Sequence, residues 1–234
     1  MTYFRQMASA DGDTLSYLLA DLDRRLAVLI DPAADQATLY LALLAEIQAR
    51  LTHVLLTHSH DAAPDGLTRL LARSGATLCA NQRTCQGLET TLACQPLTQG
   101  DVVACGDEVI RIILTPGHTA GCASYLWRDR AFTGGALLID DCGSTDGSDS
   151  DPGALYDSLT RQLLTLPDET LIYPGRSSAG RLVSSIGEQR RRNPSLVGLT
   201  RDEFIAAQRL RTLSPPQPFQ QLQRIHHAFV EKQP

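Results

Sequence analysis

Three histidines stand where their side chains could bind one metal ion. His58 and His60 directly follow an apolar run (HVLLT, 53–57), and His118 follows a Pro-Gly pair at the end of a second apolar run. Residues two apart in an extended chain point to the same side, so His58 and His60 can reach one ion. A Pro-Gly turn can present His118 outward from a strand end. Three imidazoles with a fourth position open are typical of catalytic zinc, although a His-x-His pair alone also fits ordinary loop histidines.

The segments around these histidines read as short strands that alternate with helices. Short apolar or β-branched runs bounded by turn residues predict strands at 3–8, 14–21, 26–31, 53–57, 76–80, 109–115, 123–127, 136–139 and 171–173. Helices are expected at 64–73, after the Asp151-Pro152 pair, which suits a helix start, and at 35–51, where Leu39, Leu43, Ile47 and Leu51 repeat every four residues. Thr200 and Glu203 have the spacing of a capping box and predict a further helix. This order predicts an α/β fold with two packed sheets and helices outside, and it rules out an all-α or all-β fold.

The composition is that of a globular protein. Hydrophobic residues make up 43% of the 234 residues, enough for a sizeable core. The net charge of -5 argues against nucleic-acid binding, which needs a basic face. The apolar runs are far shorter than the roughly 18 residues of a membrane span, and residues 1–14 do not read as a secretory signal. We therefore expect a cytoplasmic protein without nucleic-acid or membrane partners.

The cysteines are expected to be reduced and buried. They are Cys79, Cys85, Cys94, Cys105, Cys122 and Cys142. No two of them form a C-x-x-C pair, which argues against a thiol-redox motif or structural zinc. A chain of this length builds its own core and has no need of a disulfide scaffold. Burial as small apolar side chains is the expectation that follows.

Four segments, in this order, resemble the metallo-β-lactamase superfamily and within it the persulfide dioxygenases, which are also similar to glyoxalase II. They read THSHDAAPDG (57–66), TPGHTAGC (115–122), FTGGALLIDDCG (132–143) and LPDETLIYPGRSSAG (166–180). The resemblance implies a four-layer αββα metallo-β-lactamase fold for residues 1–212. Residues 213–234 depart from the family. A Pro-rich break followed by an amphipathic pattern predicts a helical extension there, packed on the domain or on a partner, and hence a homodimer.

The resemblance also implies an activity and a metal. Family members of known activity oxidise the persulfide sulfur of glutathione persulfide with O₂, which yields sulfite and glutathione. They hold one non-haem iron with two histidines and one aspartate, a set that leaves positions open for substrate and O₂. His58 and His118 match the two histidine ligands, whereas Gly135 stands at the position of the aspartate. Glycine cannot bind a metal through a side chain, so the implied iron triad is incomplete.

Further departures from the family pattern fall at the positions of a second metal site and at positions that recognise the substrate. Where two-metal relatives have ligands, this chain has Ala62, Ala63, Gly135 and Arg176. The three histidines that match the first site are all retained. An arginine and a tyrosine of the family pattern are replaced by Ser144 and Ser178. Loss of the arginine weakens the recognition of glutathione carboxylates, because bidentate arginine contacts are difficult to replace.

Nearby acids and thiols are further candidates. Asp61, Asp65, Asp140 and Asp141 lie close in sequence to the histidine and Gly135 segments. Any of them could replace the missing aspartate, and the alternative is that they are solvated loop acids. Cys122 and Cys142 match family cysteines. A thiolate at either position could carry a persulfide if its pKa were lowered, and the alternative is core packing.

Two functions compete at this level, beside a structural or regulatory module without a ligand. In the first, the chain is a persulfide-dioxygenase-like protein of sulfur metabolism with weak or no glutathione persulfide dioxygenase activity. It then binds a small sulfur compound as an accessory paralogue, with or without a metal. In the second, one Fe(II) or Zn ion held by His58, His60 and His118 serves to oxidise persulfides or to hydrolyse a thioester-like substrate. Three histidines on zinc lower the pKa of bound water to about 7.

Overall fold

Two β-sheets stack face to face in this protein. The structure is a computed structural model that describes residues 1–10, 12–59, 65–88, 92–177 and 180–213. Within these residues the first sheet has the order β1 (Thr2–Ala8), β2 (Leu15–Asp21), β3 (Leu26–Ile30), β4 (Arg50–Leu55), β5 (Thr77–Asn81), β6 (Gln95–Leu97). The second has the order β14 (Ser184–Ser185), β13 (Leu171–Pro174), β10 (Arg130–Gly134), β9 (Ala123–Trp127), β8 (Glu108–Leu114), β7 (Val102–Cys105). A small ribbon pairs β11 (Leu137–Leu138) with β12 (Asp141–Cys142).

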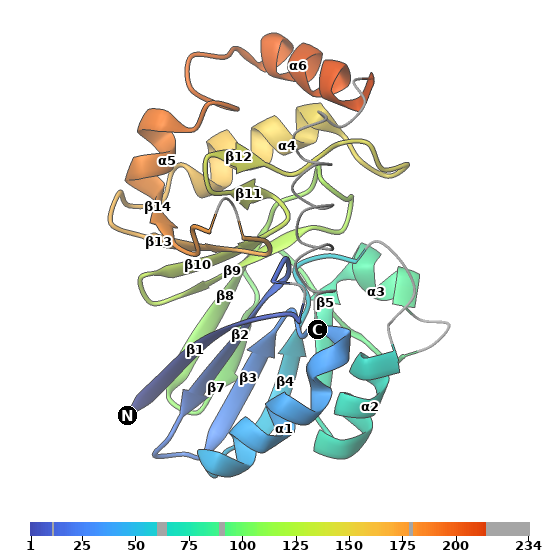
Figure 1. The fold of residues 1–234 in the computed structure, drawn as a ribbon, viewed down its shortest axis with the longest axis vertical. Coiled ribbons are helices and arrows are strands. Elements are labelled where there is room, and N and C mark those ends of the chain that lie inside the picture. Colours follow the sequence, from blue (N-terminus) through green and yellow to red (C-terminus); the bar gives the residue numbers. More distant parts are fainter. Residues whose placement is uncertain (11, 60–64, 89–91, 178–179, 214–234) are drawn as a thin grey trace, which may run out of the picture.

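Helices cover the outer face of each sheet (Figure 1). Those beside the first sheet are η1 (Ala34–Gln36), α1 (Ala37–Glu46), α2 (Asp65–Ser74) and α3 (Gln82–Leu88). Those beside the second are α4 (Pro152–Ser158), η2 (Leu159–Leu163), α5 (Ile186–Arg192) and α6 (Arg201–Leu213). The buried apolar residues form one cluster between the sheets and one between each sheet and its helices. These clusters separate four layers, which confirms the predicted αββα fold.

The sequence signals for two helix starts are confirmed. The Asp151 carboxylate accepts hydrogen bonds from the amides of Gly153 and Ala154 at the start of α4, at 2.7 and 3.0 Å. At the start of α6 the Thr200 amide donates to the Glu203 carboxylate at 2.8 Å, and the Glu203 amide donates back to the Thr200 hydroxyl at 3.4 Å. This reciprocal pair is a capping box.

The helix predicted over 35–51 is wrong at its end. α1 ends at Glu46, and Leu51 belongs to β4. The amide of Ala49 donates to the Leu44 carbonyl, and Gln48, with φ 52°, donates to Ala45. This arrangement is a Schellman motif, which closes a helix through one left-handed residue. Because that residue is Gln48 and not glycine, the sequence did not reveal the stop.

The strand predicted over 136–139 is also wrong in extent. Only Leu137 and Leu138 are extended, and the chain turns at Asp140, with φ 58°, into β12. The strand before them, β10, ends at Gly134. Gly135 therefore lies in the turn between β10 and the ribbon.

A disulfide corrects the expectation that all cysteines are reduced. Cys85 in α3 and Cys94 just before β6 are bonded, with their Cα atoms 5.3 Å apart. Among the described residues, which include every cysteine, the other four are free and buried: Cys79, Cys105, Cys122 and Cys142. A separation of nine residues does not reveal such a bond, because pairing depends on how the backbone brings two β-carbons together.

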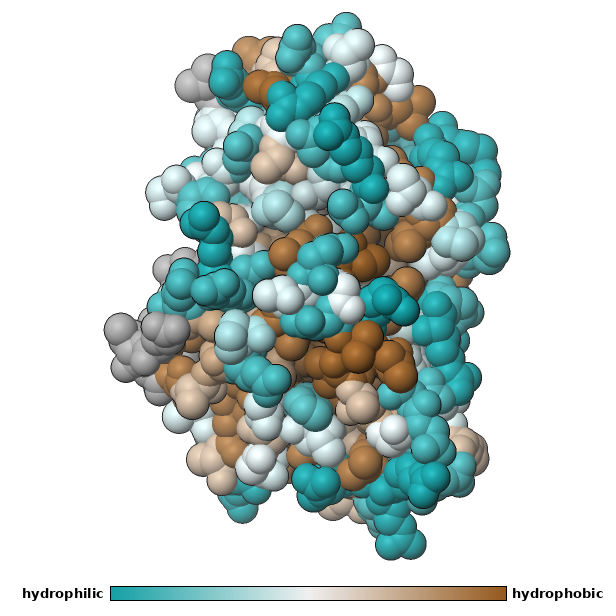
Figure 2. All heavy atoms as spheres, turned by 180° about the vertical axis from the view of Figure 1, so that it is seen from behind, coloured by the Kyte–Doolittle hydropathy of each residue, from teal (hydrophilic) through white to brown (hydrophobic). Residues whose placement is uncertain are grey.

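Figure 2 shows one face of the molecule, where apolar side chains form separate patches among hydrophilic ones. In the described part of the chain, no helix is long and apolar enough to cross a membrane. The last described helix, α6, ends at Leu213. The predicted extension therefore lies outside the described residues from 214 onward and stays a prediction.

Candidate metal centre

Four strand ends meet at one edge of the two sheets. β4 leads to His58, β8 to His118, β10 to Gly135 and β13 to Arg176. Backbone hydrogen bonds join these segments: the Ala123 amide donates to the Thr57 carbonyl, and the Gly175 amide donates to the Gly134 carbonyl, both at 2.8 Å. The fold thus brings together segments that are far apart in the sequence.

His58 and His118 face each other beside the backbone of Gly135. Their ring centroids are 5.1 Å apart and their planes are inclined by 64°. A β-carbon placed on Gly135 would lie 2.3 Å from Cδ2 and 2.8 Å from Nε2 of His118, so the ring would have to shift, and 3.1 Å from Nε2 of His58. The two Nε2 atoms therefore converge on the point where a side chain at position 135 would begin.

Hydrogen bonds at Nδ1, the ring nitrogen on the opposite side from Nε2, orient both histidines. Nδ1 of His118 lies 2.8 Å from the Ser144 carbonyl oxygen, which can only accept. Nδ1 of His58 lies 2.8 Å from the Thr57 hydroxyl, whose single proton is donated to Asp31. Both Nδ1 atoms must therefore donate, which leaves Nε2 as the atom with a lone pair on each ring. A donor bond from the opposite nitrogen is the usual support of a metal-binding histidine.

Asp31 is a site residue that the sequence analysis did not select. It follows β3, and its carboxylate accepts from the Thr57 amide and the Thr57 hydroxyl, both at 2.7 Å. Burial raises the pKa of the Asp31 carboxyl to about 6, an effect that the two hydrogen bonds from Thr57 reduce. The sequence signal that could have found it is the polar Asp-Pro pair directly after the apolar strand 26–30.

Glycines allow the loops to pack tightly around His118. A β-carbon on Gly143 would lie 2.2 Å from the Gly135 carbonyl oxygen and 2.8 Å from Cγ of His118. One on Gly134, which has φ 53°, would lie 2.2 Å from the Thr57 hydroxyl. Side chains at these positions would push the histidine segments apart.

Two of the four candidate replacement acids, Asp140 and Asp141, form ion pairs with arginines. Asp140 lies 2.7 Å from a guanidinium nitrogen of Arg181. Asp141 accepts two hydrogen bonds from Arg211, both at 2.8 Å, and one from Ser195 at 2.7 Å. Burial alone would raise the pKa of Asp141, but these hydrogen bonds hold it below its usual value. Both carboxylates are thus held in ion pairs.

Several predicted site residues have no described side chain. His60, Asp61, Ala62 and Ala63 lie outside the described residues, and Asp65 is the first residue of α2. Their roles stay predictions. Arg176, at the position of a family histidine, is exposed and pairs with Thr14 through an isolated backbone bridge.

The two candidate thiols are in the interior. Burial raises the pKa of Cys122 to about 11 and that of Cys142 to about 12. The sulfur of Cys122 lies 3.3 Å from the Thr119 amide, and that of Cys142 lies 3.1 Å from Nε2 of Gln208. Since the thiolate is the reactive form, these surroundings favour the core-packing alternative.

A cavity of about 180 Å³ lies beside His58. Leu56, Leu67 and Leu88 form its apolar wall, and Asp31 adds a carboxylate. The cavity could hold a small ligand with an apolar portion next to the imidazole of His58.

The described residues fit a metal only in part. They contain no group of three or more His, Cys, Asp or Glu side chains able to hold an ion. The convergence of two Nε2 atoms suits imidazole ligation, whereas Gly135 supplies no oxygen for an iron triad.

Comparisons with known proteins agree with this picture at the level of fold and family. No protein-family model matches the sequence. A crystal structure of a metallo-beta-lactamase from Staphylococcus aureus superposes with a TM-score of 0.79 at 21% identity, over 96% of this chain and 71% of that chain. This likeness, with the four layers and the histidines at the strand ends, defines a protein of the metallo-β-lactamase fold.

Two closer relatives define the branch. The mitochondrial persulfide dioxygenase ETHE1 of Homo sapiens is 36% identical over 217 residues, which are 91% of this chain and 83% of the relative. The crystal structure of ETHE1 from Myxococcus xanthus is 41% identical, with a TM-score of 0.82 over 92% of this chain and 93% of that one. The chain belongs to the persulfide dioxygenase family.

Proposed function

We propose that this protein binds a small sulfur compound, such as glutathione persulfide, as an accessory member of sulfur metabolism with little or no dioxygenase turnover. The observation that carries the proposal is Gly135, which lies next to the Nε2 atoms of His58 and His118 and offers no donor. An iron centre of the two-His-one-carboxylate type needs a charged oxygen ligand at such a position. Family membership supports a sulfur compound as the ligand.

The ion pairs of Asp140 and Asp141 support the same proposal. Either carboxylate would have to leave its arginine in order to reach the histidines. Arg181 would then lose Asp140 and Arg211 would lose Asp141. Replacement of the missing ligand by Asp140 or Asp141 is therefore unfavourable.

The cavity beside His58 is the ligand site in this proposal. Its leucine wall suits the apolar part of a sulfur compound, with the sulfur directed at His58.

A second function, that of a one-metal enzyme, is favoured by the orientation of the histidines. The bonds from Nδ1 of His58 to Thr57 and from Nδ1 of His118 to Ser144 hold both rings in the ligating tautomer. With His60 as the third ligand, a bound Fe(II) or Zn would supply a site for persulfide oxidation or an activated water for thioester hydrolysis.

Metal analysis and oxygen uptake separate the two functions. The purified protein, expressed with added iron or zinc, is expected to contain little metal and to consume little oxygen with glutathione persulfide. Isothermal titration with glutathione persulfide kept under nitrogen then tests binding. Rapid oxygen uptake would overturn the accessory function, and stoichiometric metal would favour the enzyme.

A pair of variants tests the role of position 135 directly. Gly135→Asp adds the missing carboxylate and is expected to raise iron content and oxygen uptake. Gly135→Asn has nearly the same size without the charge and serves as the matched control. Equal behaviour of the two variants would show that a missing carboxylate is not what limits the site.

Cytoplasmic location and a homodimer formed through residues 214–234 remain part of the proposal. Light scattering of the full chain and of a chain that ends at Leu213 tests the dimer. A full chain that is monomeric at high concentration would contradict it.

A further inference from the structure

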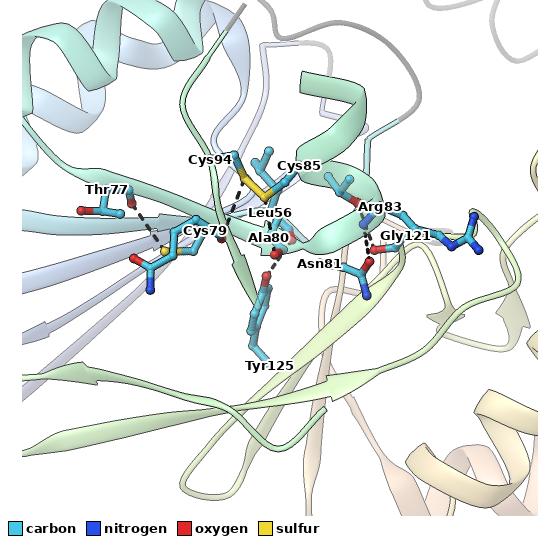
Figure 3. The surroundings of a disulfide bond; sticks show 12 residues. Leu56, Thr77, Cys79, Ala80, Asn81, Arg83, Cys85, Cys94, Gly121 and Tyr125 are labelled. Carbon is cyan, nitrogen blue, oxygen red and sulfur yellow. Dashed lines mark hydrogen bonds between the residues drawn. A yellow bond between two sulfur atoms is a disulfide. The ribbon is translucent and has the colours of Figure 1, made fainter. Parts of the chain in front are cut away.

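The disulfide between Cys85 and Cys94 ties α3 to the segment that leads into β6. Figure 3 shows this bond next to Leu56 and Ala80. The Cys85 side is fully enclosed, with 2% of the residue exposed, whereas Cys94 is only half-buried. Cys94 is therefore the more exposed of the two bonded residues.

The Cys85–Cys94 bond lies against the wall of the cavity beside His58. Cys85 and Leu88 are one helical turn apart on the buried side of α3, and Leu88 lines the cavity. The Leu92 amide donates to the Leu88 carbonyl at 2.9 Å, on the chain that leads to Cys94. Cys85 and Leu88 also belong to the apolar cluster that contains Leu56 and Leu67, the other leucines of the cavity wall.

The start of α3 is anchored independently of the disulfide. The Thr84 hydroxyl donates to the Gly121 carbonyl at 3.0 Å, in the loop that follows His118. Opening the disulfide would leave this anchor in place and would release the covalent restraint at Cys85, the next residue along the helix. The turn with Leu88 would then be held by packing and backbone hydrogen bonds.

We propose that the Cys85–Cys94 bond is an exchange site for low-molecular-weight thiols, and that its redox state sets the rigidity of the cavity wall at Leu88. A thiolate attacks Sγ of Cys94, the more exposed of the two bonded residues. A new sulfur–sulfur bond forms as the bond to Cys85 breaks, and the electron pair leaves on Sγ of Cys85, which takes a proton from water. A second thiolate attacks the mixed disulfide and releases Cys94. Two thiols are oxidised to one small disulfide, and the protein disulfide is reduced.

The neighbouring thiols do not compete for this chemistry. Cys79, on β5, lies in the apolar cluster between the sheets, whereas Cys85 lies in the cluster on the helix side of the first sheet; burial raises the pKa of Cys79 to about 11. An enclosed thiol with a raised pKa supplies little thiolate at neutral pH. The attacking group therefore comes from solution, and the inference is independent of whether the protein turns over a persulfide.

Reaction of the native full-length protein with reduced glutathione tests the exchange. Iodoacetamide is added at intervals and the labelled positions are mapped by mass spectrometry. We expect no label on Cys85 or Cys94 before glutathione, a glutathione adduct on Cys94 at early times, and both cysteines labelled later. A bond that resists glutathione until the protein is unfolded, or an adduct on Cys85, would overturn the proposal.

Single variants provide a matched pair. In Cys85→Ser the remaining Cys94 is expected to form a mixed disulfide with oxidised glutathione, whereas in Cys94→Ser the remaining Cys85 is expected to react much more slowly. Equal rates would contradict the assignment of Cys94 as the attacked sulfur. If either variant fails to fold, the adduct mapping on the wild-type chain still decides.

Hydrogen exchange tests the consequence for the cavity. After reduction of the wild-type chain, amides of α3 near Leu88 are expected to exchange faster, while those of α4, in the opposite helix layer, are unchanged. The double variant Cys85→Ser/Cys94→Ser should match the reduced protein and should not respond to glutathione. Unchanged exchange at Leu88 on reduction would show that the bond does not control the wall.

Discussion

The carboxylate of Asp31 accepts two hydrogen bonds from Thr57, one from its amide and one from its hydroxyl, both at 2.7 Å. Asp31 follows β3 and Thr57 follows β4, so the pair joins neighbouring parallel strands at the edge where the site forms. The Thr57 hydroxyl in turn accepts from Nδ1 of His58. Asp31, on the neighbouring strand, thus holds the proton of His58 on Nδ1 and leaves Nε2 directed toward His118.

Thr57→Val should release His58 from this control. Valine has the shape of threonine without the hydroxyl, so Nδ1 of His58 loses its acceptor and Asp31 keeps only the amide bond. We expect ¹⁵N NMR to show a mixture of His58 tautomers in place of one with the proton on Nδ1. Any zinc affinity should fall about 10-fold to 100-fold, the usual effect of losing such a support.

Thr115→Val is the matched control, because Thr115 is also buried and its hydroxyl is hydrogen-bonded to that of Ser124, at 3.1 Å. This variant should lose stability without a change at His58. A single unchanged tautomer in Thr57→Val would show that the hydroxyl does not orient the ring.

Asp31 should make the protein less stable as the pH rises through the range of its titration. Its pKa is about 6 in the folded protein because burial disfavours the charge, and about 3.9 in the unfolded chain. The folded state therefore binds more protons between these values, and stability falls as the pH rises from about 4 to 6. The loss is at most about 3 kcal/mol, at roughly 1.4 kcal/mol per pKa unit.

Asp31→Asn removes this titration and keeps a side chain of the same size. Urea unfolding at several pH values should show that the wild type loses stability relative to the variant between pH 4 and pH 7. Parallel curves for the two proteins would contradict the raised pKa.

Gly143→Ala should disturb the site by overpacking. The added methyl would lie 2.2 Å from the Gly135 carbonyl oxygen, a backbone atom that cannot rotate away, and 2.8 Å from His118. We expect a loss of about 1–3 kcal/mol in unfolding free energy, the typical range for forced overpacking. Gly147→Ala is the control, since its methyl would meet only Asp149, at 3.7 Å. Equal stabilities of the two variants would argue against tight packing at Gly143.

Removal of the disulfide should lower stability through the unfolded chain. The bond closes a loop with a sequence separation of nine residues, and loops of that size contribute about 2–3 kcal/mol in the chain-entropy model. Cys94→Ser, Cys85→Ser and the double variant should all lose nearly this amount in urea unfolding, because either change opens the same loop. A loss in the double variant equal to the sum of the single losses would indicate packing effects instead.

The fold and the positions of the site histidines His58 and His118 at strand ends were predictable from the sequence. Apolar runs followed by His58 and His118 mark strand ends, and strand ends on one side of packed sheets meet at one edge. These strand-end signals depend on residue type and local spacing alone. The interpretation of Gly135 as a missing ligand depends in addition on the family resemblance, which places an aspartate at that position.

The tertiary structure decided what lies next to what. Asp31, Thr57 and Ser144 orient the imidazoles through hydrogen bonds between separate loops. Arg181 pairs with Asp140 and Arg211 pairs with Asp141, although all four residues are charged and could have stayed in solvent. Cys85 and Cys94 became a pair only because α3 turns back toward β6. None of these contacts is written in sequence spacing, since each depends on the distance between side chains that the packed backbone sets.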